Sequence, residues 1–119
     1  MTTFFYLCGM RREITTFGGY FEAFIKTLNA KELFKLDYIL SLLETQDRMP
    51  SKFIKYIREE LYELRMEYEG NIFRIFFIFD GNNIVVLFNG FHKKTAKTPQ
   101  REINKALKIK KEYYAQKRL

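Results

Sequence analysis

The sequence predicts an α+β protein in which two helices precede a small twisted antiparallel sheet and a further helix follows it. Three observations predict this class. Apolar residues recur at helical spacing in residues 20–45, they alternate or run together in residues 61–91 around two turn signals, and a Thr-Pro pair opens a last amphipathic segment. With one strand before the first helix, the expected order of elements is β-αα-βββ-α.

The N-terminal half is expected to hold a strand and two helices. Residues 12–17 alternate in the manner of a strand, and a Gly-Gly pair ends it. Residues 20–28 have their apolar side chains on one helical face, at Phe21, Phe24, Ile25 and Leu28. Asn29 suits the cap of a second helix over residues 30–45. Because so little chain joins the two helices, they are expected to form an antiparallel hairpin.

The middle of the chain is expected to form a three-stranded meander. Residues 61–68 alternate, residues 72–79 are almost continuously apolar, and residues 84–91 form the third strand, which ends in an Asn-Gly pair. Short segments rich in Gly and Asn separate these runs and are typical of hairpin turns. The third run therefore lies beside the second, and the second beside the first.

The last helix is expected to begin at a Thr-Pro pair and to run to about Gln116. Thr98 suits the N-cap and Pro99 the first helical position. The inner face of this helix is expected to consist of Ile103, Leu107 and Tyr114. Its lysines are expected to face solvent and are left out of the candidate site; they are Lys105, Lys108, Lys110 and Lys111.

Length and composition predict a single folded domain over residues 1–119, because 47% of the chain is hydrophobic. Residues 1–10 are either an extension upstream of a start at Met10 or an additional strand. One cysteine, Cys8, and one histidine, His92, exclude a disulfide framework and a transition-metal centre, and no cofactor is expected. The short apolar N-terminal run lacks a preceding basic residue, so we expect a cytoplasmic protein without membrane insertion.

Positive charge is concentrated at the C-terminal end of the chain. Residues 91–119 hold ten Lys or Arg against two acids, a net charge of +8, whereas the whole chain carries +7. An imbalance confined to one segment indicates a polyanionic partner, most simply a nucleic acid.

Arg74 is the most informative single residue, because it interrupts the otherwise apolar strand IFRIFFIF. A guanidinium buried there without a partner is costly, so it either pairs with a carboxylate, such as that of Glu63 or Glu67, or faces a cleft that receives an anion. Arg65 is expected on the adjacent strand. A cluster of cations repels itself unless a phosphate neutralises it, which is typical of a nucleic-acid backbone site.

The segment after the third strand adds further candidates to this site. Lys93, Lys94 and Lys97 precede the last helix, whose N-terminus also favours anions. A lysine-rich loop is, however, more often a solvated surface than a phosphate site. His92 is a candidate auxiliary group, because imidazole exchanges protons near neutral pH.

The stretch from Leu61 to Tyr114 resembles the HigB branch of the RelE-like toxins of bacterial toxin–antitoxin modules. The matching pieces are LYELR, FRIFFIFDGNNIVVLFNGFHKKTAKTP and REINKA. The resemblance implies a RelE-like fold, with two N-terminal helices packed on a twisted antiparallel sheet. It implies functional roles for basic residues on the sheet, namely Arg65, Arg74, Lys93, Lys94 and Lys97. Glu63 departs from relatives that carry a basic residue at its position.

The resemblance also implies an activity and partners. Such toxins cleave mRNA on the ribosome by attack of the ribose 2′-OH on the adjacent phosphate, without a metal, and a helix-turn-helix antitoxin of the HigA kind inhibits them. Arg74 is then expected to stabilise the phosphorane with help from Arg65 and Lys94, Lys93 or Lys97 to act as base, and His92 to supply the acid. Two alternatives stay open: a non-catalytic basic module that binds RNA or DNA, and a degenerate toxin that serves only as the partner of its antitoxin.

Overall fold

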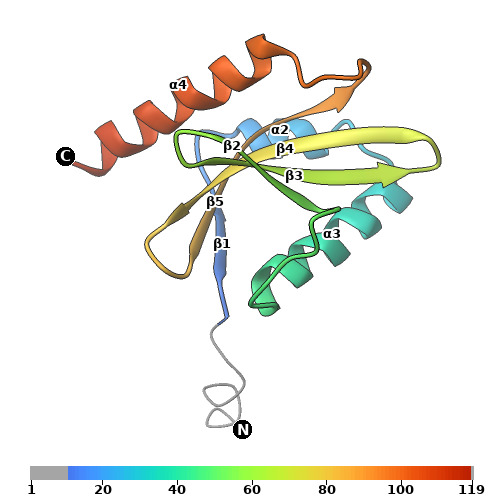
Figure 1. Ribbon diagram of the computed structural model, residues 1–119, viewed down its shortest axis with the longest axis horizontal. Helices are drawn as coiled ribbons and strands as arrows, with labels where there is room; N and C mark the ends of the chain where they lie inside the picture. The colour runs from blue at the N-terminus through green and yellow to red at the C-terminus, as the bar shows by residue number, and fades with distance from the viewer. Residues whose placement is uncertain (1–10, 119) are drawn as a thin grey trace, which may run out of the picture.

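The computed structural model describes residues 11–118, and the possible extension at residues 1–10 lies outside the described residues. Within the described residues, five strands form one sheet and three helices pack on it (Figure 1). The elements in chain order are β1 (Glu13–Thr16), α2 (Tyr20–Ile25), α3 (Ala30–Thr45), β2 (Ile54–Arg58), β3 (Leu61–Tyr68), β4 (Asn71–Asp80), β5 (Ile84–Lys93) and α4 (Gln100–Lys117).

The sheet confirms the predicted α+β class and adds two details. Its strand order is β1-β5-β4-β3-β2, and β3, β4 and β5 form the predicted antiparallel meander. The sheet is mixed rather than purely antiparallel, because β1 pairs in parallel with β5. It also contains the extra strand β2, whose five residues IKYIR are too short and too exposed to show a clear alternation.

The helices cover both faces of the sheet (Figure 1). α2 and α3 pack on one face, where Phe24, Leu36 and Ile39 join Ile75 and Phe77 in one core. Their main contacts are with β5 and β3 respectively and not with each other, so the expected antiparallel hairpin is not the packing unit. α2 ends at Ile25, three residues earlier than predicted.

The helix α4 covers part of the opposite face with Ala106 and Ile109, which are buried against the sheet. The inner residues predicted for this helix are only partly buried; they are Ile103, Leu107 and Tyr114. The helix ends at Lys117, one residue beyond the predicted end. Its main contacts with the sheet are with β5 and β4.

The two predicted helix caps have different outcomes. Asn29 caps α3 as predicted: its side chain accepts a hydrogen bond of 2.8 Å from the backbone N–H of Glu32, and the Glu32 carboxylate accepts one of 2.9 Å from Asn29. The predicted Thr98 cap of α4 is wrong. The extended residue Pro99 precedes the first helical residue, and the Thr98 hydroxyl bonds to a residue of the sheet instead.

Strand β5 runs to Lys93, beyond the Asn-Gly pair that was expected to end it. The ladder between β4 and β5 shifts register between Ile75 and Phe77, so β5 has a bulge there. Gly90 follows the bulge, and the ring of Phe24 packs directly on it. The glycine therefore permits a close approach of α2 rather than a turn, and its strand continues toward the candidate site.

Replacing Gly90 with alanine is expected to destabilise the protein by about 1–3 kcal/mol. A Cβ atom at this position lies 2.7 Å from ring atoms of Phe24, which is closer than two carbon atoms pack. Urea unfolding measures the loss. The double variant Phe24→Leu with Gly90→Ala is expected to recover part of it; equal stability of wild type and Gly90→Ala contradicts the packing.

Candidate active site

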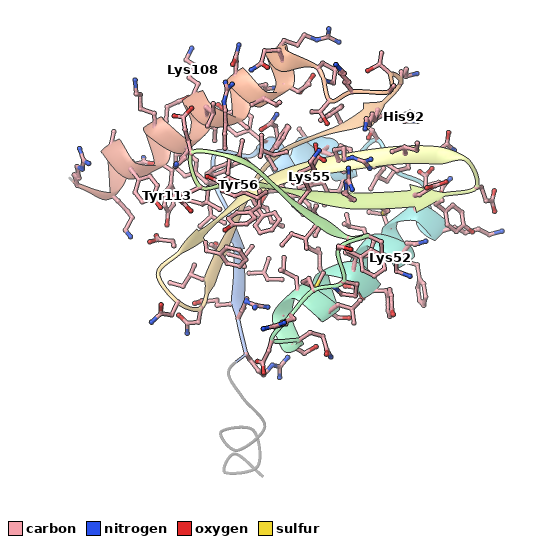
Figure 2. All side chains as sticks on the ribbon, viewed as in Figure 1. Lys52, Lys55, Tyr56, His92, Lys108 and Tyr113 are labelled. Carbon is pink, nitrogen blue, oxygen red and sulfur yellow. The ribbon has the colours of Figure 1, made fainter. Side chains whose placement is uncertain are left out.

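A hollow of about 390 Å³ opens where β2, β3 and the end of β5 meet the loop before α4. Its charged and hydroxyl side chains are Lys55, Arg65, Lys93, Lys97 and Thr98. Tyr56 also borders it, but its ring packs against Tyr62 on the other face of the sheet. Figure 2 shows Lys55 and Tyr56 on β2, the edge strand of the sheet. Residues from four segments thus converge on one hollow, which we call the basic pocket.

Beneath the basic pocket, one buried carboxylate holds two guanidinium groups. Arg65 and Arg74 are directly opposite each other on β3 and β4, so both side chains lie on the same face of the sheet. Glu63 Oε1 lies 3.3 Å from Arg74 Nε and 3.5 Å from Arg65 Nε. The Glu63 side chain is only 1% exposed and that of Arg74 10%. Of the two alternatives for Arg74, the structure shows the ion pair with Glu63.

The pair does not exhaust the hydrogen-bonding capacity of the guanidinium groups. Arg74 Nη1 donates to the backbone oxygen of Phe73 at 3.0 Å. The Nε atoms of Arg65 and Arg74 are buried and make no hydrogen bond of good geometry in the described structure, although Glu63 is close. The Arg65 side chain is 32% exposed and lines the pocket, and charged guanidinium N–H groups are strong donors to phosphate oxygens.

Burial and mutual repulsion shift the pKa values of two cations at the site. Burial lowers the pKa of Arg74, Glu63 raises it in part, and Arg65 lowers it further. Burial also lowers the pKa of Lys93 from the ordinary lysine value, and the charge of Arg74 adds to this effect. A lysine with a lowered pKa has a larger neutral fraction near neutral pH, and the neutral amine is a base.

The structure brings together four of the six predicted site residues. Arg65, Lys93 and Lys97 line the basic pocket, and Arg74 lies beneath it beside Glu63. Lys94 does not line the pocket; it is an exposed residue of the following loop. Strand β5 ends at Lys93, so no strand pairing holds Lys94 in the direction of Lys93.

His92, the sixth predicted residue, does not join the basic pocket. Its ring stacks on Phe73 at 4.8 Å between centroids, and Phe73 belongs to the core beneath α2 and α3. His92 therefore lies on the face of the sheet opposite Arg74 and Lys93, near the end of β5 (Figure 2). The register shift in β5 and the alternation of strand residues produce this separation. A direct role for His92 at the pocket does not agree with this placement.

Sequence reasoning missed Lys55, Tyr56 and Thr98. Lys55 and Tyr56 belong to the unpredicted strand β2, and β2 pairs antiparallel with β3 so that Lys55 is opposite Glu63. The sequence signal was weak: IKYIR is short and mostly exposed, and only the spacing of Lys55 and Ile57, two residues apart on one face, points to a strand. Thr98 was assigned to a helix cap, a role that competes for the same hydroxyl.

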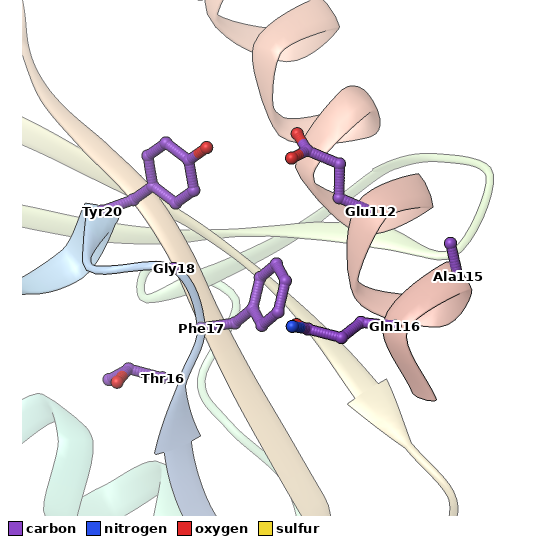
Figure 3. Close-up of a pocket in the computed structure, with 7 residues that line it drawn as sticks. All are labelled: Thr16, Phe17, Gly18, Tyr20, Glu112, Ala115 and Gln116. Atoms are coloured by element: carbon purple, nitrogen blue, oxygen red, sulfur yellow. The ribbon is translucent and has the colours of Figure 1, made fainter. Parts of the chain in front are cut away.

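A larger hollow, of about 820 Å³, lies between the β1–α2 turn and α4 but has different chemistry. Figure 3 shows Phe17 and Tyr20 on one side of it and Glu112 and Gln116 on the other. Its charged lining residue is an acid, so it does not favour a polyanion. The smaller basic pocket is the better candidate for binding phosphate.

Most of the chain matches a known protein family. The family model described as "Phage derived protein Gp49-like (DUF891)" matches residues 23–111. No curated protein matches the chain. In residues 11–118, no helix is long and apolar enough to cross a membrane. The matched range contains all of the residues that form the basic pocket and its floor.

Proposed function

The chain belongs to the phage-derived Gp49-like family, a RelE/ParE-like family of toxins in toxin–antitoxin systems, and from this premise we propose that it is a ribosome-dependent endoribonuclease. Its segments LYELR and GFHKKTAKTP favour the HigB branch of these toxins. The single observation that carries the proposal is the basic pocket, in which Glu63 holds two arginines on the same face of the sheet as the pocket lysines. Such a pocket suits a phosphodiester in a single strand of mRNA.

The proposed reaction is transesterification within the RNA strand. The ribose 2′-oxygen attacks the adjacent phosphorus, the bond from phosphorus to the 5′-oxygen breaks, and the products are a 2′,3′-cyclic phosphate and a 5′-hydroxyl. Negative charge develops on the phosphorane oxygens. Arg74 and Arg65 are fixed where they can stabilise this charge, because Glu63 orients both guanidinium groups before RNA binds.

The two proton transfers fall to lysines of the basic pocket. Lys93 in its neutral form accepts the proton of the 2′-hydroxyl, because burial and Arg74 lower its pKa. Lys97, which lines the same pocket on the loop before α4, donates a proton to the departing 5′-oxygen. This assignment balances the reaction and uses neither His92 nor Lys94, whose side chains lie outside the pocket.

Induced expression in bacteria tests the proposal. Wild type is expected to arrest growth and to leave mRNA 5′ ends that follow the codon phase, whereas Arg74→Ala, produced at the same level, is expected to do neither. A soluble, folded wild type that leaves growth and mRNA intact contradicts the catalytic proposal and favours a binding module or a degenerate toxin.

Membership in a toxin–antitoxin family implies an antitoxin partner, and we propose that it docks on the outer face of α3. The side chain of Phe34 is 79% exposed, and Tyr38 and Leu33 on the same helix are also exposed. Phe34 and Tyr38 line a hollow of about 400 Å³ together with Tyr68, Lys31 and Lys35. This mixture suits a helix-turn-helix antitoxin of the HigA kind that presents apolar side chains flanked by carboxylates.

Replacing Phe34 and Tyr38 with alanine is expected to weaken binding of the cognate antitoxin by about tenfold or more, because exposed aromatic side chains carry much of the energy of such interfaces. Both side chains are exposed, so stability is expected to be unchanged. Calorimetric titration of the purified proteins measures the effect. Lys108→Ala, on the solvent side of α4, is the control (Figure 2). Unchanged affinity of the double variant excludes this surface.

A further inference from the structure

Glu63 connects the floor of the basic pocket to the loop that forms its wall. One carboxylate oxygen faces the Nε atoms of Arg65 and Arg74, and the other, Oε2, accepts a hydrogen bond of 2.7 Å from the Thr98 hydroxyl. With 1% of its side chain exposed, Glu63 is one of the most deeply buried charged groups described. Its interactions with three partners account for that burial.

Thr98 is the direct chain neighbour of Lys97, so its hydrogen bond to Glu63 also restrains the backbone of Lys97. It lies between Lys97, which lines the pocket, and Pro99, whose extended backbone conformation precedes α4. A second hydroxyl, that of Thr95, donates to the backbone oxygen of Lys97 at 2.6 Å and shapes the loop from within. The hydrogen bond from Thr98 to Glu63 thus links the loop of residues 94–99 directly to strand β3.

We propose that Glu63 and Thr98 are positioning residues, which couple the two arginines of the pocket floor to Lys97 on the loop before α4. The Glu63 carboxylate stands in for a phosphate by separating Arg65 from Arg74 in the empty site, and Thr98 fixes the loop so that Lys97 faces the same position. The proposal deepens the proposed function and rests on the basic pocket being its phosphate site.

The charges at the site explain why a buried acid need not oppose binding of an anion. Glu63 lies in the floor with Arg65 and Arg74, while Lys55, Lys93 and Lys97 line the pocket above. The arginines and lysines outnumber the single carboxylate, so the pocket keeps a net positive charge. Loss of the Thr98 hydroxyl, by contrast, leaves Glu63 Oε2 without its hydrogen-bond donor and frees the loop.

A double-mutant cycle tests the coupling. Binding of inorganic phosphate, and of a short RNA in which a 2′-deoxy nucleotide prevents cleavage, is measured by calorimetry for the full chain. Thr98→Val is expected to weaken binding about fivefold, as is Lys97→Ala, and the double variant is expected to be little worse than either single variant. Thr98→Ser keeps the hydroxyl and is expected to bind like wild type.

Lys55 supplies the matched control, because it lines the same pocket from β2 and does not belong to the loop. In the double variant Thr98→Val with Lys55→Ala, the two fold-losses of affinity are expected to multiply, as they do for independent sites. The coupling is wrong if Thr98→Val and Lys97→Ala also multiply, if Thr98→Val binds like wild type, or if wild type binds neither probe. Coupled binding without cleavage of mRNA in a translation extract supports the positioning roles and contradicts the ribonuclease. Cleavage in the extract with independent effects of Thr98→Val and Lys97→Ala does the opposite.

Discussion

Replacing Arg74 with alanine is expected to lower the rate of mRNA cleavage by about 10²- to 10³-fold, the usual effect of removing one donor that stabilises transition-state charge. Arg74 is buried beside Glu63 and directly opposite Arg65, so its guanidinium is fixed before substrate arrives. The rate is measured in a translation extract with purified protein. Arg74→Lys keeps the charge but not the planar guanidinium, and it is expected to retain an intermediate rate.

A control for folding accompanies this variant, because removal of Arg74 leaves Glu63 with Arg65 as its cationic partner at 3.5 Å. We expect Arg74→Ala to lose about 1–3 kcal/mol of stability while it stays folded. The double variant Glu63→Gln with Arg74→Met removes the buried charge as well and is expected to regain stability without activity. Wild-type cleavage by a folded Arg74→Ala contradicts the role of Arg74.

The pH dependence of cleavage is expected to follow Lys93. Burial and the charge of Arg74 lower the pKa of this lysine, and the neutral amine is the proposed base. The rate is therefore expected to rise about tenfold per pH unit until pH reaches the lowered pKa, and then to level off. Lys93→Arg, which stays protonated, is expected to lose most of the rate and this rise. The measurement is a single-turnover rate profile from pH 6 upward, with Lys94→Arg as the control.

The same pKa shift predicts an effect of Lys93 on stability. Because its folded pKa lies below its unfolded pKa, the unfolded state takes up the proton first as pH falls, and the fold loses stability through that window. The loss is complete once the pH has fallen below the lowered pKa of Lys93. Lys93→Gln is then expected to stabilise the fold by less than about 1 kcal/mol while removing activity. A destabilised Lys93→Gln contradicts the repulsion within the pocket.

Local patterns were sufficient to predict most of the fold. The spacing of apolar residues predicted α3 with its Asn29 cap, and alternation and turn residues predicted the meander of β3, β4 and β5. The parallel pairing of β1 with β5 is a contact between distant segments, which local periodicity does not record. Strand β2 was not predicted, because its pattern covers only five residues at an edge of the sheet.

The candidate site was predicted less completely, for two physical reasons. Arg65 and Arg74 were predicted because burying a charged residue in an apolar strand is costly without a partner. This argument does not depend on the details of the sheet. The direction of His92 depends on a single shift of register in β5, which reverses the face of every later residue. The use of the Thr98 hydroxyl depends on Glu63, 35 residues away, and no local pattern distinguishes that bond from a helix cap.

The chemistry of the cut RNA ends tests the central claim most directly. A defined mRNA is translated in an extract with purified protein, and the new termini are identified. We expect a 2′,3′-cyclic phosphate and a 5′-hydroxyl at cuts made by wild type and by His92→Gln, and cuts that form about 10²- to 10³-fold more slowly with Arg74→Ala. Cuts that carry a 5′-phosphate, or the absence of cuts with an active translation extract and folded wild type, contradict it.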